Sequence, residues 1–235
     1  MISSDWYWGA YTTLVGDAMR KFGTFAFYTE EKTFNVPAFE AKVLEVLARQ
    51  DSLLSIINSP AHNPTGYSLT DSEWDAVLDV LKGQANKGKR IALLVDIAYI
   101  DFAGDAEKCR EFMKKFSNLP ANMIVMLSVS MSKSFTLYGQ RTGAIIGISS
   151  DKEAIDEFKV AMDVTSRGTW SNINRSAMQI LATINEEKAL FDAVEKERAE
   201  FKELIEKRSA IFVNEAAQVG LEILPYCGGF FISIP

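Results

Sequence analysis

The chain has 235 residues, of which 48% are hydrophobic, so it can bury a large core as one domain with part of a second. It carries 25 basic and 31 acidic side chains, a net charge of −6, and no basic stretch, which argues against nucleic acid as a partner. No apolar run is long enough to cross a bilayer, and residues 1–6 lack the pattern of a secretory signal. Cys109 and Cys227 lie far apart without a metal-ligand cluster, so we expect free thiols in a cytoplasmic protein without membrane contact.

Strand and helix patterns alternate through most of the chain. Short apolar runs bounded by turn residues predict strands, and longer runs with apolar residues at helical spacing predict helices. The strands are expected at 24–28, 53–58, 91–95, 123–129 and 144–148, and the helices at 36–49, 72–87, 106–116, 152–165 and 174–184. This alternation predicts a three-layer α/β fold, with a mainly parallel sheet and helices on both faces.

The most informative segment follows the strand expected at 123–129. It places Lys133 among serine and threonine hydroxyls, with Ser130 three residues before it and Arg141 eight residues after it. A lysine attacks a carbonyl only when it is uncharged, and an apolar or cationic setting lowers its pKa. Arginine suits phosphate because its planar guanidinium donates two parallel hydrogen bonds. The segment predicts an imine-forming lysine in a phosphate-binding cradle, although a solvated turn is the alternative explanation for the motif alone.

Two other strand ends carry polar residues. The turn after the strand at 53–58 contains Asn63, and the strand at 91–95 ends in Asp96, followed by Tyr99. Because a site on an open α/β sheet takes residues from several strand ends, we expect these side chains near the lysine. Taken separately, each is also explained by turn formation or by an ordinary solvated or packed side chain. His62, the only histidine, is more typical of a structural role than of a general base.

In order and spacing these segments resemble the class I pyridoxal-phosphate aminotransferases, the aspartate and aromatic aminotransferase group. The resemblance implies pyridoxal 5'-phosphate as the cofactor, joined to Lys133 as a Schiff base, with Ser130 and Arg141 holding its phosphate. Thr136 and Thr142 depart from the small or aliphatic residues that are usual in the family. Neither departure affects a charged group.

The same resemblance assigns roles around the cofactor ring. Asn63 and Tyr99 would reach its phenolic oxygen, and Asp96 would keep its pyridine nitrogen protonated, so that the ring accepts electrons. Once an incoming amino acid displaces Lys133, the freed amine would serve as the base that moves the substrate's α-proton. Catalysis would therefore depend on Lys133, Asp96 and Tyr99.

Two weaker matches extend the resemblance. Trp8 lies in a segment similar to the one in which the family stacks a tryptophan on the cofactor ring, but the usual asparagine and histidine after Gly9 are absent, and Trp6 competes for the role. Arg167 matches the arginine that reaches across the family's dimer to a substrate's side-chain carboxylate. An arginine that caps the preceding helix is the alternative.

From about residue 188 the chain alternates charged and apolar residues. Apolar residues at helical spacing predict one amphipathic helix over about 188–219, on the order of 45 Å long. A coiled-coil partner site is the less favoured alternative. By resemblance, residues 1–187 form a cofactor-binding large domain that is incomplete at its amino-terminal side. Residues 188–235 form the connecting helix and the start of a small domain, with a strand at 228–234.

The family's chains are longer at both ends, so we expect a piece of an aminotransferase that lacks part of the phosphate site and the clamp for the substrate's α-carboxylate. The implied reaction transfers an amino group between a dicarboxylic or aromatic amino acid and a 2-keto acid, in a homodimer. Two alternatives stay open. One is a pyridoxal-phosphate-dependent lyase on the same fold, and the other is an inactive fragment that at most binds the cofactor.

Overall fold

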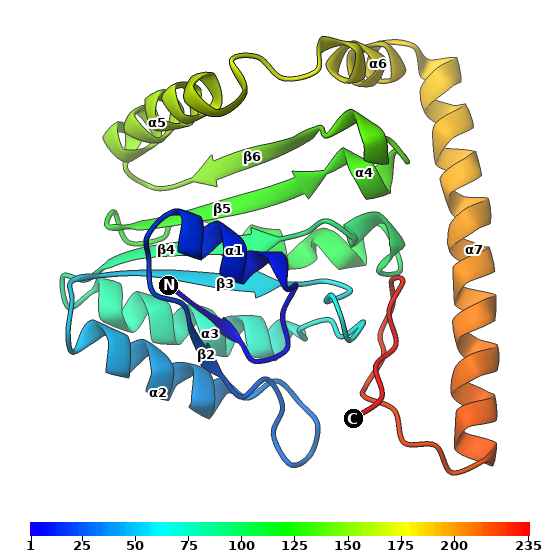
Figure 1. Ribbon diagram of the computed structural model, residues 1–235, viewed down its shortest axis with the longest axis horizontal. Coiled ribbons are helices and arrows are strands. Elements are labelled where there is room, and N and C mark those ends of the chain that lie inside the picture. The colour runs from blue at the N-terminus through cyan, green and yellow to red at the C-terminus, as the bar shows by residue number, and fades with distance from the viewer.

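A six-stranded sheet forms the centre of the computed structural model, which describes residues 1–235 (Figure 1). The strands are β1 (Ile2–Ser4), β2 (Gly23–Phe25), β3 (Ser52–Asn58), β4 (Arg90–Asp96), β5 (Met123–Ser130) and β6 (Gly143–Ile148). Their order across the sheet is β2-β1-β3-β4-β5-β6, and all neighbours are parallel except β5 and β6. The predicted α/β fold with a mainly parallel sheet is confirmed.

Helices surround the sheet. The α-helices are α1 (Ala10–Asp17), α2 (Val36–Leu47), α3 (Asp71–Ala85), α4 (Met131–Ser134), α5 (Lys152–Trp170), α6 (Arg175–Glu186) and α7 (Lys188–Gln218). The 3-10 helices are η1 (Ile100–Phe102), η2 (Lys108–Phe116) and η3 (Tyr138–Gln140). In Figure 1, α2 and α3 lie on one side of the sheet and α1 on the other, while α5 and α6 lie beyond β6.

The main core lies on the α3 side of the sheet. Alternation along β4 directs Ile91, Leu93 and Val95 into a cluster of 27 buried apolar residues. Trp74 of α3 is fully buried in this cluster and stacks on Phe112 of η2, with ring centroids 4.9 Å apart. Since the remaining side chains of β4 alternate to the opposite face, the aspartate at its end lies away from this core.

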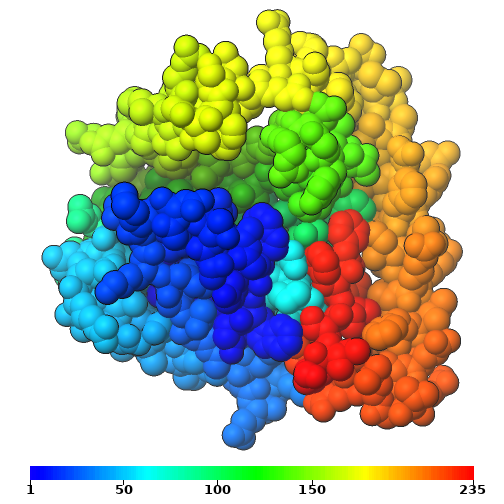
Figure 2. Space-filling view, viewed as in Figure 1, coloured from blue at the N-terminus to red at the C-terminus, as the bar shows by residue number.

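The helix predicted over 188–219 is confirmed as α7, which runs past the carboxyl ends of the parallel strands (Figure 1). Beyond α7 the chain turns back, and its last segment lies between α7 and the amino-terminal part of the molecule (Figure 2). None of the helices combines the length and the apolar character that a membrane span requires.

Three expectations about secondary structure are wrong in detail. The segment 106–116 forms a 3-10 helix that starts at Lys108. The strand expected at 24–28 ends at Phe25, because the next backbone groups bond to the Asp5 carboxylate and to the backbone of Asn35. The segment 228–234 forms no strand, since its backbone N–H groups bond to single carbonyls outside the sheet, such as those of Gly66 and Phe102.

Candidate active site

The parallel strands end side by side at the edge of the sheet that faces α7. Asn58 at the end of β3 pairs in register with Asp96 at the end of β4, and Asp96 pairs with Ser128 near the end of β5. Loops that follow neighbouring parallel strands emerge at the same edge, so the polar segments after β3, β4 and β5 meet there. They surround a cavity of about 880 Å³.

All the residues predicted to bind the cofactor line this cavity. They are Trp8, Asn63, Asp96, Tyr99, Ser130, Lys133 and Arg141. Trp6 instead packs against the main core, which leaves Trp8 as the tryptophan at the cavity. The fold therefore brings these residues together from segments that lie far apart in the chain.

Lys133 belongs to α4, the short helix that directly follows β5. Its side chain is half-buried, and the ammonium lies over two aromatic rings, 5.7 Å from the centroid of Tyr99 and 5.3 Å from that of Tyr138. It takes part in no salt bridge. An amine that is held by aromatic faces instead of a carboxylate is free to turn toward a ligand in the cavity.

Asp96 is the acid of the cavity. Its Oδ1 accepts a hydrogen bond from the Ala98 backbone N–H at 3.1 Å, and its Oδ2 accepts one from the Tyr11 hydroxyl at 2.6 Å. Burial raises the pKa of Asp96, while the bonds from Tyr11 and Ala98 and the charge of Lys133 act in the opposite direction. The carboxylate is thus held by protein donors and also borders the cavity.

Asn63 and Tyr99 meet from the loops after β3 and β4. The Asn63 side-chain amide donates to the Tyr99 hydroxyl at 3.4 Å, and the Asn63 backbone N–H donates to Oδ1 of Asn58 at 2.5 Å. Burial, with a smaller contribution from the charge of Asp96, raises the pKa of Tyr99. Both groups therefore present neutral hydrogen-bonding atoms to the same part of the cavity.

Arg141 also lines the cavity. Its guanidinium is exposed, donates to the Tyr138 carbonyl at 2.8 Å and to the Ser132 hydroxyl at 3.4 Å, and has no carboxylate partner. The residue takes the left-handed conformation at φ 52°. A cation that is fixed by its own loop and left without an acid suits an anionic group.

Arg167 does not join the cavity. It lies in the last turn of α5, is exposed, and donates to the Ser171 hydroxyl at 2.8 Å, which is the contact expected of an arginine that caps its helix. His62 is also outside the cavity. It is buried, stacks on Phe27 at 4.7 Å, and its Nδ1 is 2.8 Å from the Thr65 hydroxyl.

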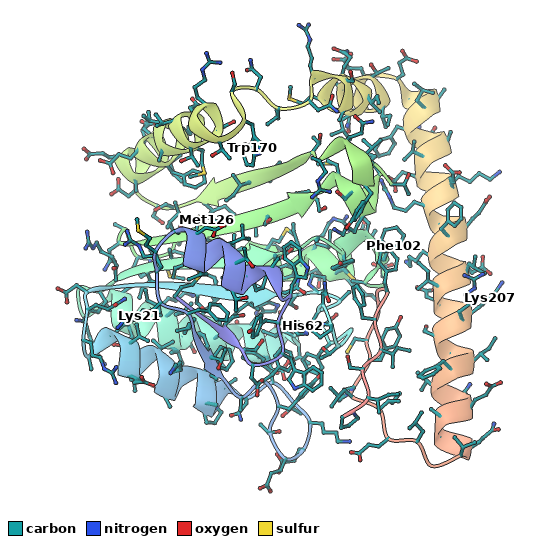
Figure 3. All side chains as sticks on the ribbon, viewed as in Figure 1. Lys21, His62, Phe102, Met126, Trp170 and Lys207 are labelled. Atoms are coloured by element: carbon teal, nitrogen blue, oxygen red, sulfur yellow. The ribbon has the colours of Figure 1, made fainter.

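Several cavity residues were not predicted from the sequence. An apolar wall comes from η1, α7 and the carboxyl-terminal segment, and Figure 3 shows Phe102 where the sheet faces α7. The wall consists of Phe102, Phe201, Ile205, Phe230 and Phe231. The apolar spacing of α7 was a signal that it packs against something, but no local pattern links these segments to the lysine. Tyr11 was missed as well, because its partner is 85 residues away.

A lysine, an acid and a cation meet around one cavity on a mainly parallel α/β sheet. The family model for class I and II aminotransferases matches residues 1–234. The chain therefore belongs to the class I and II aminotransferase family.

Individual relatives agree with this assignment. The chain is 29% identical to tyrosine aminotransferase from Klebsiella pneumoniae, over 80% of its length and 45% of that protein. It is 27% identical to aspartate aminotransferase from Escherichia coli strain K12, over 91% of its length and 52% of that protein. It spans about half the length of these curated relatives.

Solved structures give the same result. An aminotransferase from Anaerococcus prevotii superposes with a TM-score of 0.97 at 42% identity, over 100% of this chain and 57% of that one. An aromatic-amino-acid aminotransferase from Burkholderia pseudomallei, covalently bound to pyridoxal phosphate, superposes with a TM-score of 0.78 at 26% identity, over 94% and 53% of the two chains.

Proposed function

We propose that this chain carries the cofactor-binding part of a pyridoxal-phosphate-dependent transaminase, which moves an amino group between a dicarboxylic or aromatic amino acid and a 2-keto acid. The observation that carries the proposal is one cavity lined by Lys133, Asp96, Asn63, Tyr99 and Arg141, which come from the end of β4 and from the segments that follow β3, β4 and β5. Family membership, and the pyridoxal phosphate bound to the Burkholderia relative, support the same cofactor here.

The residues around the cavity suit this cofactor chemically. Arg141 is a cation without an acid, and with the hydroxyls of Ser130 and Ser132 it offers donors to a phosphate. Asp96 is an acid that suits a protonated ring nitrogen, and Trp8 offers an aromatic face at the cavity. When bound, pyridoxal phosphate supplies a ring that accepts electrons from the substrate's α-carbon.

Each residue around the cavity would then have its own role in the reaction. The Lys133 amine would hold the cofactor and, when free, would accept the substrate's α-proton at Nζ. The Asp96 carboxylate would keep a proton on the ring nitrogen. Asn63 and Tyr99 would offer hydrogen-bonding atoms to the cofactor's phenolic oxygen.

The organisation of the whole protein is part of the proposal. Residues 1–187 would form the large domain, and residues 188–235 the connecting helix and the start of a small domain, in a homodimer. Arg167 is exposed and outside the cavity of its own chain, so the proposed contact with a substrate carboxylate would be made in a partner subunit. The free thiols of Cys109 and Cys227 support a cytoplasmic location.

A spectroscopic experiment tests the assignment of the lysine. The purified chain is mixed with pyridoxal phosphate, its visible spectrum is recorded, and the sample is reduced with borohydride and digested for mass spectrometry. We expect a visible band and a covalent adduct on Lys133, both absent in Lys133→Ala. Lys207→Ala is the matched control, because this lysine points away from the sheet on the outer side of α7 (Figure 3). A band that survives in Lys133→Ala would show that another group holds the cofactor.

The reaction is tested in a chain extended to the length of its relatives. Keto-acid production that depends on an added 2-keto acid would identify a transaminase, whereas production without one would identify a lyase. A chain that binds the cofactor but turns over no amino acid would favour the inactive alternative. Best turnover of purely aliphatic amino acids would contradict the role proposed for Arg167.

A further inference from the structure

The buried Tyr11 forms a phenol–carboxylate pair with Asp96, which lines the cavity. Tyr11 belongs to α1 and Asp96 ends β4, and the Tyr11 hydroxyl donates to Oδ2 of Asp96 at 2.6 Å. Only 4% of Tyr11 is exposed, and its ring meets that of Trp8 edge to face at 5.7 Å. Packing therefore holds the phenol in place on the acid.

The other two oxygens of Asp96 accept hydrogen bonds from backbone N–H groups and from one side chain that does not line the cavity. Oδ1 accepts from the Ala98 backbone N–H, and the Asp96 carbonyl accepts from the Asn58 side-chain amide at 2.8 Å and from the Ser59 backbone N–H at 3.2 Å. Tyr11 is thus the only side chain that donates to the carboxylate. Without it, Oδ2 would lose its partner and the side chain could rotate.

We propose that Tyr11 is a positioning residue, whose phenol fixes the Asp96 carboxylate in the orientation that faces the cofactor ring. This rests on the proposed function, in which Asp96 holds the proton of the ring nitrogen. A carboxylate that accepts one bond at each oxygen keeps further lone pairs for a ligand in the cavity. The hydrogen bond from Tyr11 therefore orients the carboxylate in the absence of cofactor and leaves acceptor sites free on both oxygens.

The phenol suits this task because it stays neutral. Burial is the main reason that the pKa of Tyr11 is raised, with the charge of Asp96 adding to it, so the hydroxyl keeps its proton. The other titratable groups that face Asp96 are Tyr99 and Lys133. The bond from Tyr11 counteracts the effect of burial on Asp96, which favours the ionised carboxylate that a protonated ring nitrogen requires.

A second tyrosine–carboxylate pair in the chain provides the control. The Tyr67 hydroxyl donates to Oε1 of Glu73 at 2.7 Å, in the main core and outside the cavity. Tyr67→Phe removes the same kind of bond as Tyr11→Phe. Changes that reflect only a weakened fold should therefore appear in both variants, whereas changes at Asp96 should appear in one.

The experiment measures the Asp96 carboxyl directly. Carbon-13 NMR of chain labelled in aspartate side chains gives its pKa without cofactor, and titration with pyridoxal phosphate gives the dissociation constant. We expect Tyr11→Phe to raise the pKa of Asp96 and to weaken cofactor binding about tenfold, since a hydrogen bond to a charged group is lost. Tyr67→Phe should change neither. Equal values in Tyr11→Phe and in the unmodified chain would overturn the proposal.

Incorporation of 3-fluorotyrosine at position 11 covers the case in which Tyr11→Phe does not fold. Fluorine keeps the ring and makes the phenol a stronger donor, so the pKa of Asp96 should fall, and an unchanged value would overturn the proposal. Failure of the proposed function has a different signature. In that case the unmodified chain does not bind pyridoxal phosphate, although the pKa of Asp96 still responds to position 11.

Discussion

Arg198 of α7 clamps the backbone carbonyl of Ser134, the residue next to the cavity lysine. Its Nε and Nη2 both donate to this oxygen, at 3.1 and 3.0 Å. The guanidinium also lies over the Phe135 ring at 4.9 Å, and only 11% of the side chain is exposed. The long helix therefore fixes the carboxyl end of α4, the helix that carries Lys133.

Substitution Arg198→Met should loosen this end of the site. Methionine keeps an aliphatic stem but leaves the Ser134 carbonyl without its donor, which should cost about 1.5–3 kcal/mol of unfolding free energy. We expect slower covalent labelling of Lys133 by pyridoxal phosphate and borohydride as well. Urea denaturation and mass spectrometry measure the two effects. Arg208→Met, at an exposed position of the same helix, is the control, and equal effects in both variants would argue against the clamp.

Arg141 should discriminate between cofactor forms with and without phosphate. We expect Arg141→Ala to raise the dissociation constant of pyridoxal phosphate about tenfold or more, because a charge-assisted contact is lost. Binding of pyridoxal, which has no phosphate, should be unaffected. Spectroscopic titration with both compounds checks this. Equal weakening of both would show that the substitution disturbs the loop instead of the phosphate contact.

His62 should make stability depend on pH. Burial lowers the pKa of His62 to about 4 in the folded chain. In the unfolded chain the imidazole has its ordinary pKa of 6.5, so between these two values only the unfolded chain binds the proton. The free energy of unfolding should therefore fall as the pH drops from about 6.5 to about 4, by up to about 3 kcal/mol from this residue.

The variant His62→Gln isolates that contribution. Asp96 acts in the opposite sense, since its raised pKa favours the folded state at low pH, and it is present in both proteins. Urea denaturation at pH 7.5 and pH 5 should give a smaller difference for His62→Gln than for the unmodified chain. Identical differences would show that the histidine is not buried in its neutral form.

Trp74 should be a main support of the core. It is 1% exposed and stacks on Phe112, so Trp74→Ala should lower the unfolding free energy by about 3–5 kcal/mol. Trp170→Ala is the matched control. This tryptophan is 64% exposed, and its loss should change the unfolding free energy by less than about 0.5 kcal/mol. Chemical denaturation measures both, and similar losses would contradict the packing of Trp74 in the core.

Much of the sheet and of the polar site could be predicted from the sequence, because the signals are local. The strand before Asp96 is an apolar run, and the turn at Asn63 contains prolines and a glycine. The resemblance assigns roles to residues that lie at or just after the predicted strand ends. These are the positions that parallel pairing brings together.

The rest depends on contacts between distant segments. Helix α1 begins after Gly9 without a side-chain cap, so no local pattern predicts the helix. The position of Tyr11, which lies on this helix, could not be predicted either. The contact of Arg198 joins residues 64 positions apart. The composition of the carboxyl-terminal segment is typical of a strand, but its backbone bonds to Gly66 and to Phe102 of η1. Propensity alone does not specify which partner a segment finds.

The paired register of Asn58, Asp96 and Ser128 has a consequence for insertions and deletions. Adjacent residues of a strand point to opposite faces, so a single-residue deletion within β4 would exchange the faces of the residues that follow it. The Asp96 carboxylate would then point to the face of the sheet on which Val95 lies in the intact strand. Every residue of the site would still be present in the chain. The number of residues in each strand is therefore as much a part of this site as the identity of its side chains.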